Sequence, residues 1–73
     1  MVHELAYIHP DANIGKDVTI DPFAYVSGDV SIGEGTWVGS NAVIMDGARI
    51  GENCKISPGA VVSAVSQDLK YKG

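Results

Sequence analysis

The stretch VSGDVSIGEGTWVGSNAVI, residues 26–44, places Ile or Val at every sixth position, starting with Val26 and ending with Ile44. The same six-residue spacing extends outward in both directions, and every position on it is again Ile or Val. Helices repeat near 3.6 residues and strands at 2, so neither explains a strict period of six. The full aliphatic column is Ile8, Ile14, Ile20, Val26, Ile32, Val38, Ile44, Ile50, Ile56 and Val62.

A second column of mostly small residues lies four positions after the aliphatic one. Its members are Ala12, Val18, Ala24, Val30, Thr36, Ala42, Ala48, Cys54, Ala60 and Ser66. The position just after each aliphatic residue is rich in glycine, with Gly15, Gly33, Gly39 and Gly51. We expect these glycines to supply the backbone conformation of corners. A large inward residue, a small inward residue and a corner in every six positions is the repeat of a parallel β-helix.

The repeat predicts an all-β fold of about three to four stacked coils. Each hexad forms one short strand and one bend, and three hexads, or 18 residues, bring the chain back to the same side of a triangular prism. Coils stack at the inter-strand spacing of about 4.8 Å, and only stacking buries their apolar side chains. Residues 1–65 are therefore predicted to form one β-helix domain. The next aliphatic position is Asp68, so residues 66–73 are expected to leave the domain as a polar exit loop.

Composition narrows the class of partner. The 73 residues carry a net charge of −4, which disfavours nucleic acid and anionic membranes. No apolar stretch approaches the ~20 residues of a membrane helix, and the first residues lack the pattern of a secretory signal. The single cysteine cannot form an internal disulfide. We expect a cytoplasmic protein without membrane insertion.

Candidate catalytic or metal-binding groups are few. His3 and His9 have no third histidine and no cysteine pair to join them, so the sequence predicts no metal site, no cofactor and no catalytic residue. Cys54 occupies a small inward position and is interpreted as a packing residue. Aspartate at a bend hydrogen-bonds its own backbone, so we expect no paired-carboxylate site among the bend aspartates. These aspartates are Asp11, Asp17, Asp21 and Asp29.

Residues eighteen apart in the sequence stack on one face of such a solenoid, and one outward column is apolar along its whole height. This apolar stripe consists of Tyr7, Tyr25, Val43 and Val61. Leu5 and Phe23 form a second apolar stack beside one end of it. Strands carry aromatic and branched residues on solvated faces, whereas contiguous exposed apolar patches mark interfaces. Both interpretations stand, and the second makes the stripe a self-association surface.

The tail QDLKYKG, residues 67–73, carries the most specific motif of the chain. It resembles the QDLKY-x-G loop of UDP-N-acetylglucosamine acyltransferases, the first enzymes of lipid A synthesis. AYIHPDA, residues 6–12, is similar to the opening coil of that family, and VIMDGARIG, residues 43–51, to its third coil. The resemblance covers the whole chain and implies that the β-helix is left-handed.

The resemblance also implies an activity. Members of that family are homotrimers with active sites between subunits, and they move a 3-hydroxyacyl chain from acyl carrier protein to the 3-hydroxyl of UDP-N-acetylglucosamine. By this resemblance Gln67, Asp68 and Lys70 would contact substrate. The apolar stripe, identified by counting, would be buried if three copies closed about a three-fold axis, which agrees with the family's trimer. The family's catalytic histidine, a general base, sits several coils further on. Neither His3 nor His9 matches it, so these residues alone are expected to be inactive.

Two hypotheses therefore remain open. In the first, the chain is the N-terminal part of such an acyltransferase, truncated before the rest of the solenoid. In the second, it is a stand-alone or engineered truncated β-helix that acts as a self-assembling trimer module. A natural reading frame that continues past Gly73 with further hexads, a histidine and a helical tail would favour the first.

Overall fold

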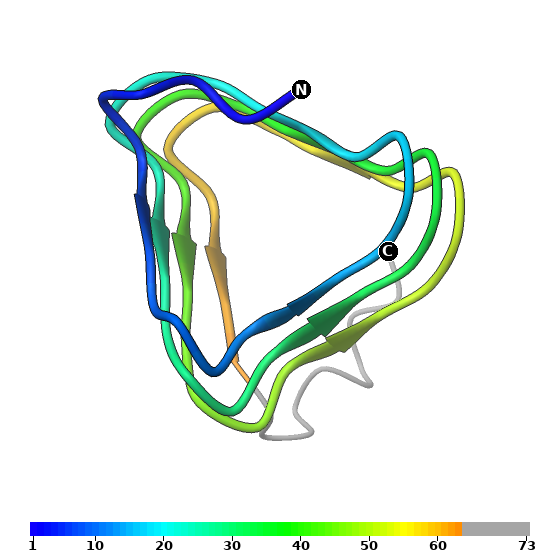
Figure 1. Ribbon diagram of the computed structural model, residues 1–73. Coiled ribbons are helices and arrows are strands. Elements are labelled where there is room, and N and C mark those ends of the chain that lie inside the picture. The colour runs from blue at the N-terminus through cyan, green and yellow to red at the C-terminus, as the bar shows by residue number, and fades with distance from the viewer. Residues whose placement is uncertain (64–73) are drawn as a thin grey trace.

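The structure, a computed structural model, describes residues 1–63, which form a triangular β-helix (Figure 1). Each side of the triangle carries strands of two residues, and each strand joins one outward residue to the aliphatic residue that follows it. The strands are β1 (Tyr7–Ile8), β2 (Asn13–Ile14), β3 (Thr19–Ile20), β4 (Tyr25–Val26), β5 (Ser31–Ile32), β6 (Trp37–Val38), β7 (Val43–Ile44), β8 (Arg49–Ile50), β9 (Lys55–Ile56) and β10 (Val61–Val62).

The strands stack into three parallel sheets, ordered β1-β4-β7-β10, β2-β5-β8 and β3-β6-β9. Every pairing joins residues 18 apart, as in Tyr7 with Tyr25 and Ile32 with Ile50. The chain winds counter-clockwise as it recedes from the viewer in Figure 1, so the helix is left-handed. The predicted fold class, the 18-residue coil and the outward columns are confirmed.

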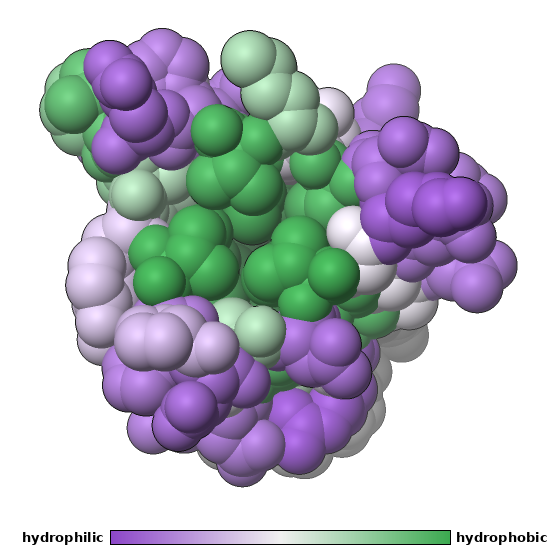
Figure 2. All heavy atoms as spheres, in the orientation of Figure 1, coloured by the Kyte–Doolittle hydropathy of each residue, from purple (hydrophilic) through white to green (hydrophobic). Residues whose placement is uncertain are grey.

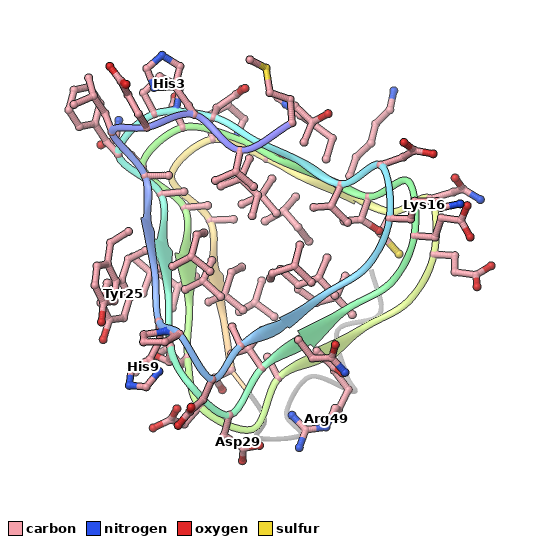
Figure 3. The ribbon with its side chains drawn as sticks, viewed as in Figure 1. His3, His9, Lys16, Tyr25, Asp29 and Arg49 are labelled. Atoms are coloured by element: carbon pink, nitrogen blue, oxygen red, sulfur yellow. The ribbon has the colours of Figure 1, made fainter. Side chains whose placement is uncertain are left out.

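The aliphatic and small columns fill the prism. Val26, Val38 and Ile44 are fully buried in its middle coils, and Figure 3 shows side chains of the strands pointing into the triangle from all three sides. Thr36 occupies a position where the neighbouring coils carry Val18 and Cys54, and it is fully buried. Its hydroxyl donates to the Gly51 carbonyl (2.7 Å) and accepts from the Cys54 N–H (3.1 Å). Both hydrogen bonds satisfy a polar group that burial would otherwise penalise.

The N-terminal end of the prism is only partly closed. In Figure 2, apolar side chains occupy the centre of this end and hydrophilic ones surround it. Ile8 and Ile14 are half-buried, whereas their partners one coil later, Val26 and Ile32, are 0% and 3% exposed. Burial of the core therefore depends on having a coil on both sides. Within residues 1–63, no helix of the length and apolarity needed to cross a membrane is present.

The glycine column has a role that differs from the predicted one. None of its members has a positive φ among the described residues. Instead, the coils approach too closely for a side chain: a Cβ on Gly33 would lie 2.6 Å from the Gly51 carbonyl carbon, and one on Gly39 would lie 2.6 Å from the Pro58 nitrogen. The prediction of a conformational role is wrong for this column. Gly15, Gly33 and Gly39 thus let neighbouring coils stack, whereas a Cβ on Gly51 would meet only Cys54 Sγ, at 3.9 Å.

Truncation of a central aliphatic residue tests the core. Ile32→Ala should lower the free energy of unfolding by about 2–5 kcal/mol, because it removes a buried side chain and leaves a cavity. Ile32 is 3% exposed, whereas Ile56 is only partly buried against the core. Ile56→Ala is therefore the matched control and should cost clearly less in urea denaturation. Equal losses at the two positions would contradict the core described here.

Candidate functional site

The apolar stripe forms one face of the prism, on sheet β1-β4-β7-β10. The Tyr7 and Tyr25 rings stack with their centroids 5.3 Å apart and their planes 15° from parallel. Tyr25 projects from this face, on the left in Figure 3, and each of the two tyrosines is nearly half exposed. Val61 is 65% exposed, and Val43 between them is half-buried. The stripe is thus a continuous, largely uncovered apolar strip.

A strained aromatic residue stands at the corner beside the stripe. Phe23 is 61% exposed, and its N–H donates to the carbonyl of Leu5 (3.2 Å), which is 56% exposed. Phe23 has a φ of 68°, in the left-handed region. That region is unfavourable for a bulky side chain. The other described residues with positive φ are Asp17, Gly35, Asn41, Gly47, Asn53 and Gly59, all of types that tolerate it.

A polar pocket lies beside the apolar stripe, at the edge opposite the corner that holds Phe23. It is a concave space of about 500 Å³ at the corner that joins sheet β1-β4-β7-β10 to sheet β2-β5-β8. In Figure 3 this corner lies at the bottom left, between the labelled His9 and Asp29. The corner pocket is lined by His9, Asp11, Tyr25, Ser27, Gly28, Asp29 and Asp46.

Hydrogen bonds across three coils fix the groups of the corner pocket. The N–H of Asp29 donates to Asp46 Oδ1 (3.0 Å). Arg49 Nη2 donates to Asp29 Oδ1 (2.8 Å), and its Nη1 donates to the Asp29 carbonyl (2.9 Å). The Asp11 N–H donates to His9 Nδ1 (3.0 Å), so this ring nitrogen acts as an acceptor. The pocket therefore presents three carboxylates, of which one is paired with a cation.

The bend aspartates behave differently from the prediction. Asp29 accepts from Arg49, and Asp21 Oδ2 accepts from Trp37 Nε1 (2.9 Å) on the next coil. Within residues 1–63, none of the four bend aspartates forms a hydrogen bond from its side chain to its own backbone, so the prediction is wrong for Asp11 and Asp17 as well. Sequence reasoning also passed over Ser27 and Asp46. Counting by 18 would have placed Ser27 on His9 and Asp46 on Gly28, one position from Asp29.

The residues predicted to contact substrate, Gln67, Asp68 and Lys70, lie outside the described residues. Elsewhere the chain offers little catalytic chemistry. Over residues 1–63, no three His, Cys, Asp or Glu side chains are placed to hold a metal ion. His3 Nδ1 accepts from the Leu5 N–H (3.1 Å), and Cys54 Sγ lies 3.6 Å from the Glu52 carbonyl. Both side chains make local contacts only.

Comparison with known proteins assigns the class. The family model described as bacterial transferase hexapeptide (six repeats) matches residues 11–36 and 29–64. The chain therefore belongs to the bacterial hexapeptide-transferase family. A search of curated protein sequences gives no significant match.

Among solved structures, the chain is similar to two enzymes of one kind. The UDP-N-acetylglucosamine acyltransferase of Campylobacter jejuni is 34% identical with a TM-score of 0.85, over 100% of this chain and 29% of that one. The UDP-N-acetylglucosamine acyltransferase of Arabidopsis is 32% identical with a TM-score of 0.52, over 99% of this chain and 33% of that one. The chain thus spans about a third or less of the length of these enzymes.

Two single substitutions, one at position 23 and one at position 41, test the backbone strain at Phe23. The two positions are one coil apart in the same column, and both have positive φ. Phe23→Asn should raise the free energy of unfolding by about 1 kcal/mol, because asparagine tolerates the left-handed region. Asn41→Phe should lower it by a similar amount. Urea midpoints that move in the opposite directions would show that the backbone at Phe23 is not strained.

Proposed function

We propose that the chain is the N-terminal β-helix of an acyl-[acyl carrier protein]–UDP-N-acetylglucosamine O-acyltransferase. Such an enzyme transfers a 3-hydroxyacyl group to the sugar 3-hydroxyl in lipid A synthesis. The observation that carries the proposal is the similarity of essentially the whole chain to two UDP-N-acetylglucosamine acyltransferases, with 34% identity and a TM-score of 0.85 for the first. The QDLKYKG motif of residues 67–73 supports the same activity. A cytoplasmic setting, as the single cysteine suggests, belongs to this proposal.

In this proposal the described coils act as a scaffold, and the motif that follows them contacts substrate. Gln67, Asp68 and Lys70 offer an amide, a carboxylate and an ammonium group, which suit the hydroxyls and phosphate oxygens of a nucleotide sugar. The general base is not supplied by the histidines of this chain, since the Nδ1 atoms of His3 and His9 accept backbone N–H groups two residues away. The 73 residues alone should therefore transfer no acyl group.

We further propose that the apolar stripe is the interface of a homotrimer. Complete burial of a large apolar side chain contributes about 1.5–3 kcal/mol relative to exposure. Tyr7, Tyr25 and Val61 still expose 49%, 44% and 65% of their surface, so a three-fold arrangement that covered the stripe would gain from each of them. The same exposure supports the second candidate function, a self-assembling β-helix module without catalytic activity.

A chimera tests the acyltransferase proposal. The segment of the Campylobacter enzyme that this chain matches is replaced by the 73 residues, and acyl transfer to UDP-N-acetylglucosamine is measured with acyl carrier protein as donor. The chimera should be active and the 73 residues alone inactive. In the chimera, Lys70→Ala should lower kcat/KM by about 10-fold or more, because a hydrogen bond to a charged group contributes about 1.5–3 kcal/mol.

Lys72→Ala is the matched control in the chimera, because it removes the same charge two residues away, outside the three positions assigned to substrate. It should change kcat/KM by less than about 2-fold. Equal losses in the two variants would overturn the role of Lys70, and an inactive but folded chimera would count against the function itself.

A charge placed on the stripe tests the trimer. Light scattering of the 73-residue chain should give the mass of three copies, and Val61→Glu should shift it to a monomer, because a carboxylate would be buried in the interface. Asn13→Glu adds the same charge at an exposed outward position of a neighbouring sheet, and it should leave the trimer intact. A monomeric parent chain, or a trimeric Val61→Glu variant, would show that the stripe is not the interface.

A further inference from the structure

We propose that the corner pocket binds the ammonium group of a small aliphatic amine. This assignment is independent of acyl transfer, because neither the motif of residues 67–73 nor a catalytic histidine takes part in it. It rests on three features of the pocket: an unpaired buried hydroxyl, an excess of carboxylate oxygens without a donor, and an aromatic wall.

The unpaired hydroxyl belongs to Ser27. This residue is only 9% exposed and lines the pocket, in the outward column between His9 and Met45. Among residues 1–63, its Oγ has no hydrogen-bond partner, although its N–H donates to the Ile44 carbonyl (2.9 Å). A buried polar group left unpaired is destabilising. A ligand that offers an N–H donor in the pocket would remove this cost.

The three carboxylates of the pocket determine which ligand charge and shape it can accept. Asp11, Asp29 and Asp46 are pure acceptors when ionised; Arg49 pairs with Asp29, and Asp11 Oδ2 lies 4.0 Å from His9 Nδ1. One oxygen of Asp29 and one of Asp46 are already occupied, by Arg49 and by a backbone N–H respectively. A planar guanidinium pairs most strongly with both oxygens of one carboxylate, through two parallel bonds. An ammonium group is a compact charge with three donors that can point to different acceptors, so it suits the remaining single oxygens.

Other ligand classes fit less well. A metal ion would need three closely placed ligating groups, and residues 1–63 hold no such group. An anion would be repelled by the carboxylates. The aromatic wall, Tyr25, favours an aliphatic ligand, since its ring can cover methylene groups or face the cation. A volume of about 500 Å³ is within the range of small-molecule sites.

Titration with a diamine tests the proposal on the 73-residue chain. The probe is 1,4-diaminobutane at physiological salt, where long-range attraction between exposed charges is largely screened. Saturable shifts of the backbone amide signals of Ser27, Asp29 and Asp46 are expected in NMR spectra. The quaternary analogue, 1,4-bis(trimethylammonio)butane, keeps both charges but has no N–H donor. It should bind at least about 10-fold more weakly. Absence of saturation, or equal affinity for both probes, would overturn the proposal.

A second ligand separates a free amine from a protein side chain. Nα-acetyl-lysine methylamide carries the same ammonium group on a peptide-like body. We expect it to bind no more tightly than the diamine, since the pocket provides no group assigned to a peptide backbone. Tighter binding of the lysine compound would overturn the assignment to a free amine.

Two substitutions locate the site. Asp46→Asn keeps the acceptor for the Asp29 N–H but removes the charge, and it should weaken diamine binding about 10-fold or more. Asp17→Asn is the control, since it removes one charge at a different corner, and it should change the affinity by less than about 2-fold. If the two substitutions weakened binding equally, the diamine would be held only by general attraction to an acidic chain. That result would contradict the proposed site.

Ser27→Ala distinguishes a serine that binds the ligand from one that only supports the fold. It should weaken diamine binding, while the urea midpoint of the free chain stays the same or rises, because the removed hydroxyl has no partner in the fold. A lower midpoint, or unchanged affinity, would show that Ser27 takes no part in binding.

Discussion

Hydrogen bonding between coils is the constraint on which the rest of the structure depends. A backbone N–H in one coil donates to a carbonyl 17 residues further on: Tyr25 to Ala42 (2.8 Å), Ser27 to Ile44 (2.9 Å) and Ser31 to Ala48 (3.1 Å). Turns such as Ala12 N–H to the His9 carbonyl (3.0 Å) are paired within one coil. The strand groups have partners only in neighbouring coils, and buried polar groups must be paired. Each coil must therefore keep the same length and register as its neighbours. This is why the six-residue period runs from Ile8 to Val62 without an insertion.

The same constraint explains what the sequence could predict. Positions that every coil repeats, such as the column containing Ile32 and Ile50, follow from counting, and the structure pairs them as expected. The role of Gly33 did not follow, because it arises from the distance to the next coil and not from its own conformation. The corner pocket was missed because its groups come from three coils and several adjacent columns. No single column displays Ser27 and Asp46 together.

Comparison of the coils also separates the repeated residues, which build the fold, from the residues that differ from coil to coil. Inward positions are nearly interchangeable between coils, so family membership follows from them. Outward positions such as Phe23 vary, with an aromatic side chain where the other described corners of positive φ carry Asp, Asn or Gly. The apolar stripe and the corner pocket are built from such side chains outside the repeated inward columns. Proteins that share the solenoid can therefore differ in what they bind, since function resides in the site and not in the fold.

Duplication of one coil tests the dependence on inter-coil pairing most directly. A second copy of residues 27–44 is inserted after Ile44, which adds 18 residues in phase with the repeat; a control insertion omits Ser40 from the copy. The in-phase insertion adds a coil paired on both sides, so the urea midpoint should rise, as expected when each repeat contributes its own interface. The control shifts every later residue by one position, and its midpoint should fall well below that of the parent chain. Equal midpoints for the two insertions, or a fall with the in-phase copy, would contradict the account.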